Sequence, residues 1–264
     1  MADFIHNHHH HLLLEVKNIS KRFASRRENT AISALNDVSF TIERRGSALG
    51  ILGESGSGKT TLAKIICGLE IPDEGKIFYG GKDVTGRISG IQMIFQNPYA
   101  SLNSKLKISS QIREAVKARR KYSHHKSIVG RASEILSLVG LNPDEILERF
   151  PHQLSTGQRQ RVAIARALAA EPDLIIADEA VSSLDVSVQA QILNIFRELK
   201  SRTNISLIFI SHDALATAYV CDNIMVMKDG KIIEHNGSRE IISAPQSQYT
   251  RELVGAAAIP VMSL

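Results

Sequence analysis

Short apolar runs alternate with longer amphipathic stretches along most of this chain. Runs typical of strands are LLLEV at 12–16, VSFTI at 38–42, ALGIL at 48–52, KIFY at 76–79, IQMIF at 91–95, LIIAD at 174–178 and SLIFIS at 206–211. Stretches with helical spacing are TTLAKIICGL at 60–69 and VQAQILNIFRELKSR at 188–202, and NIMVMKDGKIIEH at 223–235 predicts a hairpin closed at Asp229-Gly230. Strands that alternate with crossover helices predict an α/β fold with a mostly parallel sheet.

Residues from about 100 to 160 interrupt this alternation. They are rich in Lys, Arg, Ser and helix formers, in stretches such as 109–122, 127–140 and 143–150, and they predict a helical insertion. A basic run extends from Arg113 to Lys126. We interpret it as a solvated helix face, with contact to an acidic partner as the alternative.

Composition narrows the class of protein only slightly. The chain has 264 residues, 43% hydrophobic and 22% charged, with a formal net charge of +5. This balance suits a globular protein and leaves nucleic acid, ATP or an anionic membrane surface open as partners. The two cysteines, Cys67 and Cys221, have no metal-binding spacing, which fits a reducing cytosol. No apolar run approaches the roughly 20 residues of a membrane helix, and we expect no signal peptide.

The strongest chemical signal is GESGSGKT at 53–60, a glycine-rich phosphate-binding loop of the Walker A type. It follows an apolar strand and opens a helix, the context in which backbone N–H groups and a helix N-terminus bind phosphate. Lys59 is suited to the β- and γ-phosphates, and the Thr60 hydroxyl to Mg²⁺. An ordinary Gly/Ser turn is the alternative. The residues that we expect to contact nucleotide here are Gly53, Glu54, Ser55, Gly56, Ser57, Gly58, Lys59, Thr60 and Thr61.

A pair of acids, Asp178 and Glu179, ends the apolar strand LIIAD. Because neighbouring strand positions point to opposite faces, we expect the two carboxylates to have different tasks. Asp178 is suited to hold Mg²⁺ through water, and Glu179 to polarise the attacking water as a general base. A solvent-facing acid pair at a strand end is the alternative interpretation.

Further motifs make the chain resemble the ATP-binding-cassette (ABC) ATPases over roughly residues 12 to 240. LSTGQRQR at 154–161 is similar to their signature sequence, SSLD at 182–185 to their D-loop, and IFQN at 94–97 and ISHD at 210–213 to their Q-loop and switch motif. The resemblance implies a P-loop NTPase fold with a RecA-like core, an antiparallel β subdomain and a helical subdomain. The domains expected are a His-rich tail at 1–11, the ATPase at 12–240 with its insertion at about 100–160, and a short C-terminal tail at 241–264.

Residue roles follow from this resemblance. It implies that Phe23 stacks on adenine, that Gln96 senses Mg²⁺ or water, and that His212 contacts the γ-phosphate, although a buried structural histidine is the alternative. In the family two cassettes pack head to tail around two ATP molecules, so the signature of one chain completes the site of the other. The residues with this role in trans would be Ser155, Gly157, Gln158 and Asp185.

Two positions depart from the family pattern. Thr156 replaces the usual glycine of the signature, and we expect its branched side chain to stiffen and crowd the loop with a modest change in rate. Ser155 as an ordinary helix cap is compatible with its role in trans. Ala180 replaces the proline often found after the catalytic glutamate, and we expect little effect from it.

Several stretches resemble the peptide/opine/nickel importer branch of the family, among them IQMIFQNPYASLN at 91–103. This implies an ATPase at the cytoplasmic face of the membrane, with ATP and Mg²⁺ as cofactors. Its partners would be a second ATPase subunit, two permeases and an extracytoplasmic binding protein, without nucleic acid. Peptide and nickel or metal-chelate cargo stay equally open.

Other interpretations receive less support from the motifs. DNA-repair ABC ATPases would carry long coiled coils, and ribosome-associated ones a duplicated cassette. P-loop kinases and GTPases do not combine the signature, the D-loop and the switch histidine. The tract HNHHHH at 6–11 is an expression tag or tail, or alternatively a weak chelator of transition metals.

Overall fold

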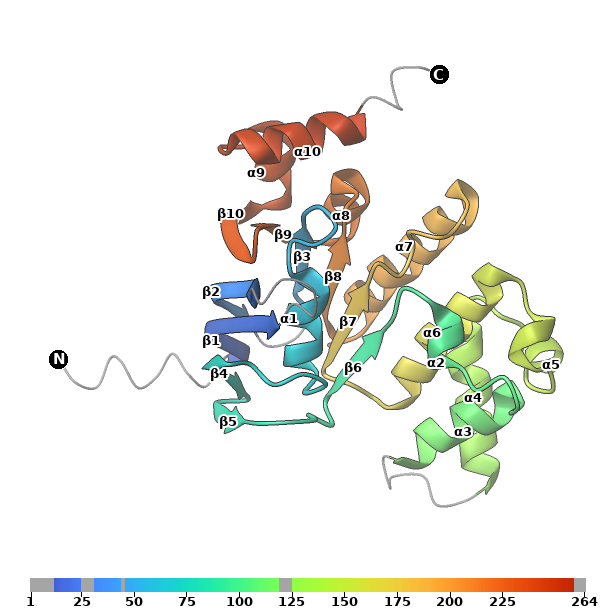
Figure 1. Cartoon of the computed structure of the whole chain (residues 1–264). Helices are drawn as coiled ribbons and strands as arrows, with labels where there is room; N and C mark the ends of the chain where they lie inside the picture. The colour runs from blue at the N-terminus through green and yellow to red at the C-terminus, as the bar shows by residue number, and fades with distance from the viewer. Residues whose placement is uncertain (1–11, 25–30, 44–45, 119–124, 259–264) are drawn as a thin grey trace. The chain divides into compact units, whose positions relative to one another are not determined.

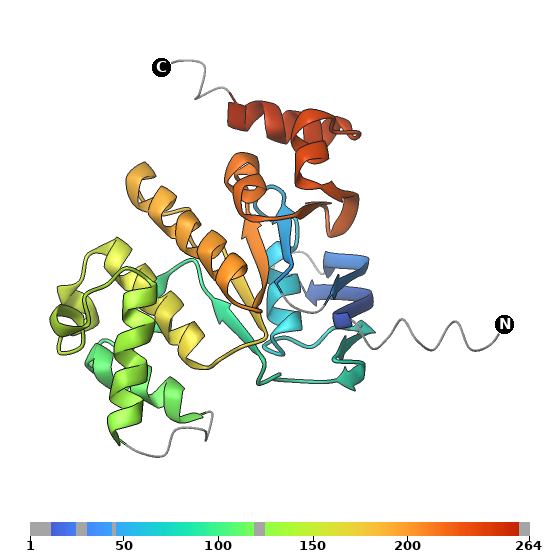
Figure 2. The same ribbon diagram turned by 180° about the vertical axis from the view of Figure 1, so that it is seen from behind.

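The computed structural model describes residues 12–24, 31–43, 46–118 and 125–258, which divide into two compact units (Figures 1 and 2). The first unit comprises residues up to 88 and from 200 onward, and the second comprises residues 89–199. The His-rich tract at 6–11 and part of the basic run at 113–126 lie outside the described residues.

The first unit contains an antiparallel sheet with strand order β2-β1-β4-β5. Its strands are β1 (Leu12–Ala24), β2 (Ala31–Glu43), β4 (Glu74–Tyr79) and β5 (Lys82–Val84). The sequence pattern marked only short segments of β1 and β2. The strands are longer because β1 pairs with both β2 and β4, with shifts in register that locally interrupt the apolar alternation.

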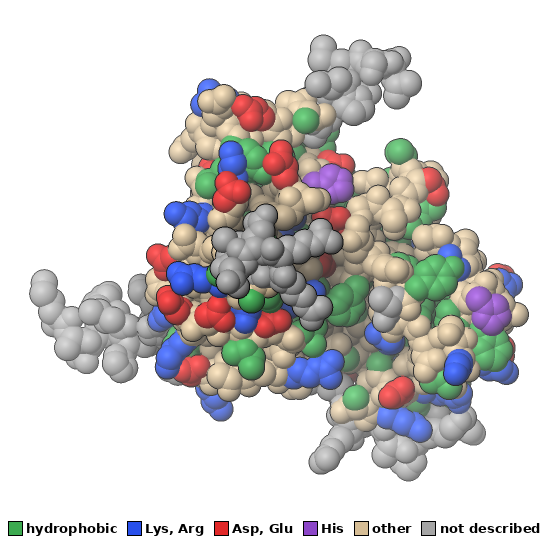
Figure 3. Space-filling model, in the orientation of Figure 1, with side chains coloured by type: hydrophobic (Ala, Val, Ile, Leu, Met, Phe, Trp, Pro, Cys, Tyr) green, Lys and Arg blue, Asp and Glu red, His purple; other side chains and the backbone are tan. Residues whose placement is uncertain are grey.

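The charged residues of this sheet are mixed in sign. Figure 3 shows Lys and Arg side chains interspersed with Asp and Glu over the region of β1, β4 and β5. Lys21 pairs with Glu70 at 3.0 Å and with Asp73 at 3.1 Å, and Lys76 pairs with Asp83 at 2.7 Å. Among the described residues of this region, basic side chains are thus paired with acidic ones.

A second group of strands in the first unit runs in the order β10-β9-β3-β8. It contains β3 (Ala48–Leu52), β8 (Ser206–Ser211), β9 (Asn223–Lys228) and β10 (Lys231–Gly237). Strand β3 runs parallel to β8 and β9, and all residues of β3 and β8 are buried, as their apolar runs predict. The predicted hairpin at Asp229-Gly230 is present, since Lys228 pairs with Lys231 across the turn.

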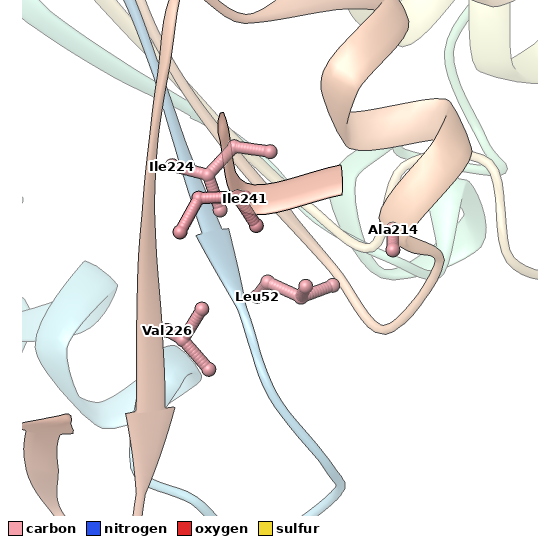
Figure 4. Packing of buried hydrophobic residues seen from close by; sticks show 5 residues of the cluster. All are labelled: Leu52, Ala214, Ile224, Val226 and Ile241. Atoms are coloured by element: carbon pink, nitrogen blue, oxygen red, sulfur yellow. The ribbon is translucent and has the colours of Figure 1, made fainter. Parts of the chain in front are cut away.

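The helices of the first unit pack against these strands (Figure 1). They are α1 (Lys59–Ile66), α8 (Ala214–Val220), α9 (Ser238–Ser243) and α10 (Gln248–Ala258). Figure 4 shows the core between them, where Leu52, Ala214, Ile224, Val226 and Ile241 are fully buried. Part of the segment that we assigned to a C-terminal tail from 241 thus lies in helices, and its residues from Ile241 to Val254 contribute to the core of this unit.

The second unit is largely helical, with one parallel pair of strands, β6 (Ile91–Ile94) and β7 (Leu174–Asp178). Its helices are α2 (Pro98–Ser101), α3 (Ile108–Ala118), α4 (His125–Leu138), α5 (Pro143–Ile146), α6 (Thr156–Ala169) and most of α7 (Val186–Arg202). Helix α5 is shorter than the pattern at 143–150 predicts. The carbonyls of Leu147 and Arg149 accept instead from the first N–H groups of α3, at 2.9 Å each.

Both cysteines are buried in the first unit. Burial raises the pKa of the Cys221 thiol well above its ordinary value, so the sulfur stays protonated. The structure therefore agrees with the expectation that neither cysteine forms a disulfide within the chain.

Candidate nucleotide site

The glycine-rich loop connects β3 to α1 and turns sharply at Gly58. Gly58 has φ 102° and precedes the first residue of α1. A Cβ atom at this position would lie 2.3 Å from the backbone oxygen of Ala34, so only glycine fits the turn. The strand–loop–helix context predicted for residues 53–60 is present, and it directs the N-terminus of α1 toward the loop.

Lys59 is buried, and its ammonium group is held by the loop itself. Its Nζ donates to the carbonyl oxygens of Gly53 at 2.7 Å and Glu54 at 2.6 Å, and to Ser57 Oγ at 3.3 Å. A buried ammonium that is bound by neutral carbonyls can exchange them for phosphate oxygens, which form stronger charge-assisted hydrogen bonds. Thr60 is exposed and Thr61 half-buried at the first turn of α1, so the Thr60 hydroxyl is accessible.

The loop receives one contact that the sequence did not predict. The hydroxyl of Tyr249, on helix α10, accepts a hydrogen bond from the backbone N–H of Glu54 at 3.1 Å. The two residues are 195 positions apart in the chain. No local motif marks such a pairing, and the only sequence signal was an aromatic residue in a polar C-terminal stretch.

Two other predicted residues of the first unit are accessible. Phe23 in β1 is 40% exposed, and Lys21 Nζ lies 5.4 Å from its ring centroid. His212 follows the last residue of β8 and is exposed, which excludes the alternative of a buried structural histidine. The next residue, Asp213, caps α8 by accepting from the N–H of Ala216 at 3.0 Å, so the turn that presents His212 is anchored by a helix cap.

In the second unit, the two acids of LIIADEA differ because the chain turns between them. Asp178 is the last residue of β7 and is buried. Glu179 has φ 47°, the left-handed conformation, and is half-buried. We had expected strand alternation to separate the carboxylates, and that reason was wrong, since Glu179 lies beyond the strand. A left-handed non-glycine residue stores strain of a kind that concentrates at functional sites.

Gln96 meets Glu179 through its side-chain amide. Nε2 of Gln96 donates to Oε2 of Glu179 at 3.1 Å and to Oγ of Ser182 at 3.2 Å. Ser182 Oγ also donates to the backbone oxygen of Glu179 at 3.0 Å. The structure thus brings the predicted Q-loop residue, the predicted base and the first serine of the D-loop motif into one hydrogen-bonded group.

The signature opens α6 as a capping box. The Ser155 hydroxyl accepts from the N–H of Gln158 at 3.2 Å, and Oε1 of Gln158 accepts from the N–H of Ser155 at 3.0 Å. Ser155 is therefore the helix cap that we considered beside its role in trans. Gly157 packs closely on α7, because a Cβ atom there would lie 2.6 Å from Cγ1 of Val188.

The side chain of Thr156 is exposed and does not crowd the loop as we expected. Its Oγ1 accepts from Nη2 of Arg159 at 3.1 Å, and the Arg159 guanidinium stacks over Tyr99 at 4.1 Å from the ring centroid. The hydroxyl thus extends the network that orients a buried arginine. The modest change in rate stays a prediction.

Asp185 acts within its own chain as the cap of α7. Its Oδ1 accepts from the N–H of Val188 and from the Ser187 hydroxyl, each at 2.9 Å. Both contacts lower the pKa of the Asp185 carboxyl, and the contact with the N–H of Val188 has the larger effect. The carboxyl is therefore ionised at neutral pH. The contact of Asp185 with a second subunit stays a prediction.

The sequence profile described as ABC transporter matches residues 35–182, more than half of the chain. The chain belongs to the ABC transporter family. It is 39% identical over 257 residues to the oligopeptide transport ATP-binding protein OppF of Bacillus subtilis (strain 168), covering 94% of this chain and 83% of that protein. It is 42% identical over 236 residues to the dipeptide transport ATP-binding protein DppF of Haemophilus influenzae, covering 85% and 70%.

Solved structures of ABC cassettes have the same fold. The dimeric post-hydrolysis structure of the ATP-binding cassette MJ0796 bound to ADP and Pi is 28% identical, with a TM-score of 0.76 over 86% of this chain and 99% of that one. CbiO1 of Clostridium perfringens, part of the ABC transporter complex cbiONQ, is 25% identical, with a TM-score of 0.76 over 96% and 100%. These similarities confirm the predicted fold class and the ATP-binding-cassette assignment of this ABC family member.

Within the described residues, each helix of this ABC protein is too short or too polar to span a bilayer. The same residues contain no group of three or more His, Cys, Asp or Glu side chains that could bind a metal by themselves. A cation at this site would therefore need ligands other than such a cluster, among which nucleotide phosphates are the usual choice for Mg²⁺.

Proposed function

We propose that this chain is the ATP-binding and ATP-hydrolysing subunit of an importer, and that it energises peptide uptake through partner permeases. The observation that carries the proposal is the glycine loop that holds buried Lys59 in a chain similar to peptide-transport ATP-binding proteins along 94% of its length. A loop of this kind binds the phosphates of a nucleotide, and the relatives couple that binding to transport.

In this proposal the loop residues bind the phosphates of ATP. Lys59 transfers its donors from the carbonyls of Gly53 and Glu54 to the β- and γ-phosphates, and the N–H groups at the start of α1 add their partial positive charge. Phe23, exposed in β1, stacks on the adenine ring. Lys59, the start of α1 and Phe23 would all contact ATP from the first unit.

The residues assigned to Mg²⁺ fit that ion by their chemistry. Thr60 offers a hydroxyl, Gln96 an amide oxygen and Asp178 a carboxylate, and hard divalent cations take oxygen ligands of these kinds. Asp178 would act through water. When bound, Mg²⁺ neutralises charge that develops on the phosphates.

Hydrolysis requires a base and an orienting group. Glu179 is the proposed base, because its carboxylate is accessible and Gln96 fixes one of its two oxygens. His212 contacts the γ-phosphate and helps to position the attacking water, in keeping with its exposure at the end of β8. General-base catalysis of this kind contributes about 10²–10⁴-fold to a rate.

The site is completed by a second subunit in this proposal. Ser155 and Gly157 of the signature, ordered by Gln158, contact the γ-phosphate of the neighbouring chain, and Asp185 reaches across the interface. The dimeric structures of MJ0796 support such an arrangement. The N-terminus of α6, already oriented by its capping box, is suited to an anion.

The remaining partners follow from the transporter assignment. We propose two permeases, an extracytoplasmic binding protein and a location at the cytoplasmic face of the membrane, where the chain is peripheral. Peptide is the proposed cargo because the relatives described above are named for oligopeptide and dipeptide transport. We propose no nucleic-acid partner.

The test combines hydrolysis with assembly. Wild-type protein co-expressed with its permeases should hydrolyse ATP, with stimulation by a binding protein loaded with a peptide mixture, and a Lys59→Ala variant should not. A nickel chelate serves as the comparison cargo. Co-purification with nucleic acid instead of permeases, or stimulation by the nickel chelate alone, would contradict the proposal.

A further inference from the structure

Helix α10 lies over the phosphate-binding loop and contacts it through Tyr249. The Tyr249 hydroxyl accepts from the N–H of Glu54 at 3.1 Å. That N–H belongs to the peptide group whose carbonyl, on Gly53, accepts from Lys59 Nζ at 2.7 Å. One planar peptide therefore connects the tyrosine hydroxyl to the lysine ammonium, because its N–H and its C=O are fixed relative to each other.

The backbone on the other side of Glu54 is held by hydrogen bonds of its own. The next carbonyl along the chain, that of Glu54, also accepts from Lys59 Nζ at 2.6 Å and from the N–H of Ser57 at 3.2 Å. Rotation of the Gly53–Glu54 peptide would move the Gly53 carbonyl away from the lysine. The hydrogen bond that the N–H of Glu54 donates to the Tyr249 hydroxyl opposes that rotation from the opposite edge of the plane.

Helix α10 is anchored well enough to serve as a support. Glu234 of β10 accepts from the N–H of Gln246 at 2.9 Å and of Ser247 at 3.0 Å, directly before the helix begins. Ser247 Oγ accepts from the N–H of Thr250 at 3.0 Å, and the Thr250 side chain is fully buried. These contacts flank Tyr249 on both sides in the sequence.

The tyrosine ring is fixed as well. It is partly buried against the cluster of Figure 4, and Lys228 Nζ lies 4.6 Å from its centroid. Burial and the negative charges of Glu54 and Asp229 raise the pKa of the phenol, although the N–H of Glu54 lowers it. The hydroxyl is therefore neutral and retains its proton while accepting from the loop.

We propose that Tyr249 is a positioning residue of the nucleotide site, which fixes the Gly53–Glu54 peptide and through it presents Lys59 to the phosphates of ATP. The proposal rests on the proposed function as an ATPase. It gives the C-terminal helix a task in nucleotide binding, and it makes α10 responsive to the occupancy of the loop, since coupling between two sites is reciprocal.

The test compares Tyr249→Phe with Tyr219→Phe in the full-length protein. Both variants remove one phenol hydroxyl, and Tyr219 is 45% exposed on α8 of the same unit. The measurements are ATP affinity by calorimetry, KM and kcat of hydrolysis in the permease complex, thermal unfolding, and amide hydrogen exchange of residues 52–58 without nucleotide.

We expect Tyr249→Phe to weaken ATP binding about 3–10-fold, the equivalent of one hydrogen bond. KM should rise by a similar factor while kcat stays within about 2-fold, because the hydroxyl does not touch the reacting atoms. The Glu54 amide should exchange faster without nucleotide, and ATP should slow exchange in α10 of the wild type more than in the variant. Tyr219→Phe should leave the ATP affinity and the exchange of the Glu54 amide as they are in the wild type.

Unchanged affinity together with unchanged exchange at Glu54 would overturn this proposal and leave the proposed function intact. Equal loss of kcat and of thermal stability would also overturn it, because a purely structural role would act in that way. A wild-type protein that bound no ATP would overturn the proposed function and this proposal with it. The exchange measurement without nucleotide still reports on the contact if the variant binds poorly for another reason.

Discussion

The amide nitrogen of Gln96 lies 3.1 Å from Oε2 of Glu179, and this contact joins the glutamine of the Q-loop motif to the proposed base. The amide donor holds the carboxylate in one orientation, which suits a side chain proposed to accept a proton from water. The contact engages one carboxylate oxygen of the proposed base, Oε2. Ser182 reinforces the arrangement through the backbone oxygen of Glu179.

Replacing the base tests this arrangement most directly. Glu179→Gln keeps the size of the side chain and removes its basicity, so we expect hydrolysis to fall by about 10²-fold or more. ATP should then accumulate with two chains paired around it. ATPase assays and size-exclusion chromatography with ATP measure both effects, with Gln191→Glu on α7 as a control for the change in amide and charge. A variant that stays monomeric with ATP and its partner subunit would contradict completion of the site in trans.

The Ser155 cap has a structural and a proposed catalytic task that can be separated. Ser155→Ala should lower the free energy of unfolding by about 1 kcal/mol, because the N–H of Gln158 loses its acceptor. Ser155→Asn should keep most of that stability, since asparagine caps helices equally well. We expect both variants to lose hydrolysis, measured beside chemical denaturation. Full activity in the asparagine variant would show that Ser155 is only a cap.

Gly157 can be probed with a compensating change on α7. Gly157→Ala places a Cβ atom 2.6 Å from Cγ1 of Val188 and should destabilise the unit by about 1–3 kcal/mol. Adding Val188→Ala removes the obstructing methyl groups and should restore part of that stability. Hydrolysis should stay low in the double variant, because the proposed approach of the signature to a phosphate leaves no room for a methyl group. Recovery of activity together with stability would contradict the proposed approach.

Acid should loosen the attachment of α10 through Glu234. Burial alone would raise the pKa of this carboxyl, but the N–H groups of Gln246 and Ser247 and nearby hydroxyls lower it below its ordinary value of 4.5. A carboxyl whose pKa is lowered by folding adds stability above its unfolded pKa, and that stability disappears as pH falls through the folded value.

The matched variant is Glu234→Gln, which cannot ionise. We expect the melting temperature of the wild type to exceed that of the variant at neutral pH, and the difference to shrink as pH falls below about 4.5. Thermal unfolding across this range measures it. A difference that stays constant with pH would show that the charge of Glu234 does not stabilise the helix.

Local patterns were enough to predict the parts of the fold that depend on buried strands and on glycine turns. The runs ALGIL, LIIAD and SLIFIS appear as the fully buried strands β3, β7 and β8, and the loop at 53–60 lies where its motif placed it. Each of these features is encoded within about ten residues. Composition and spacing therefore sufficed.

Features that depend on distant partners were not predictable in this way. We assigned residues 241–264 to a short tail, yet Ile241 packs in a core formed with residues from β3 and β9. Asp178 is buried at the end of β7, and Glu179 is half-buried just beyond it. This difference comes from the left-handed backbone conformation of Glu179, which no hydrophobic periodicity reveals. The contact between Tyr249 and Glu54 spans 195 positions and has no local signature at all.

The burial of Cys67 and Cys221 is useful for site-specific labelling of this ABC protein. Thiol-directed probes react with the thiolate of exposed cysteines, and both native sulfurs are enclosed by the core, with that of Cys221 held in its protonated form. A single cysteine introduced on α10 or beside the signature could thus carry a fluorophore or spin label on an otherwise native background. Distances between such reporters would show whether the proposed pair of subunits separates and rejoins during turnover.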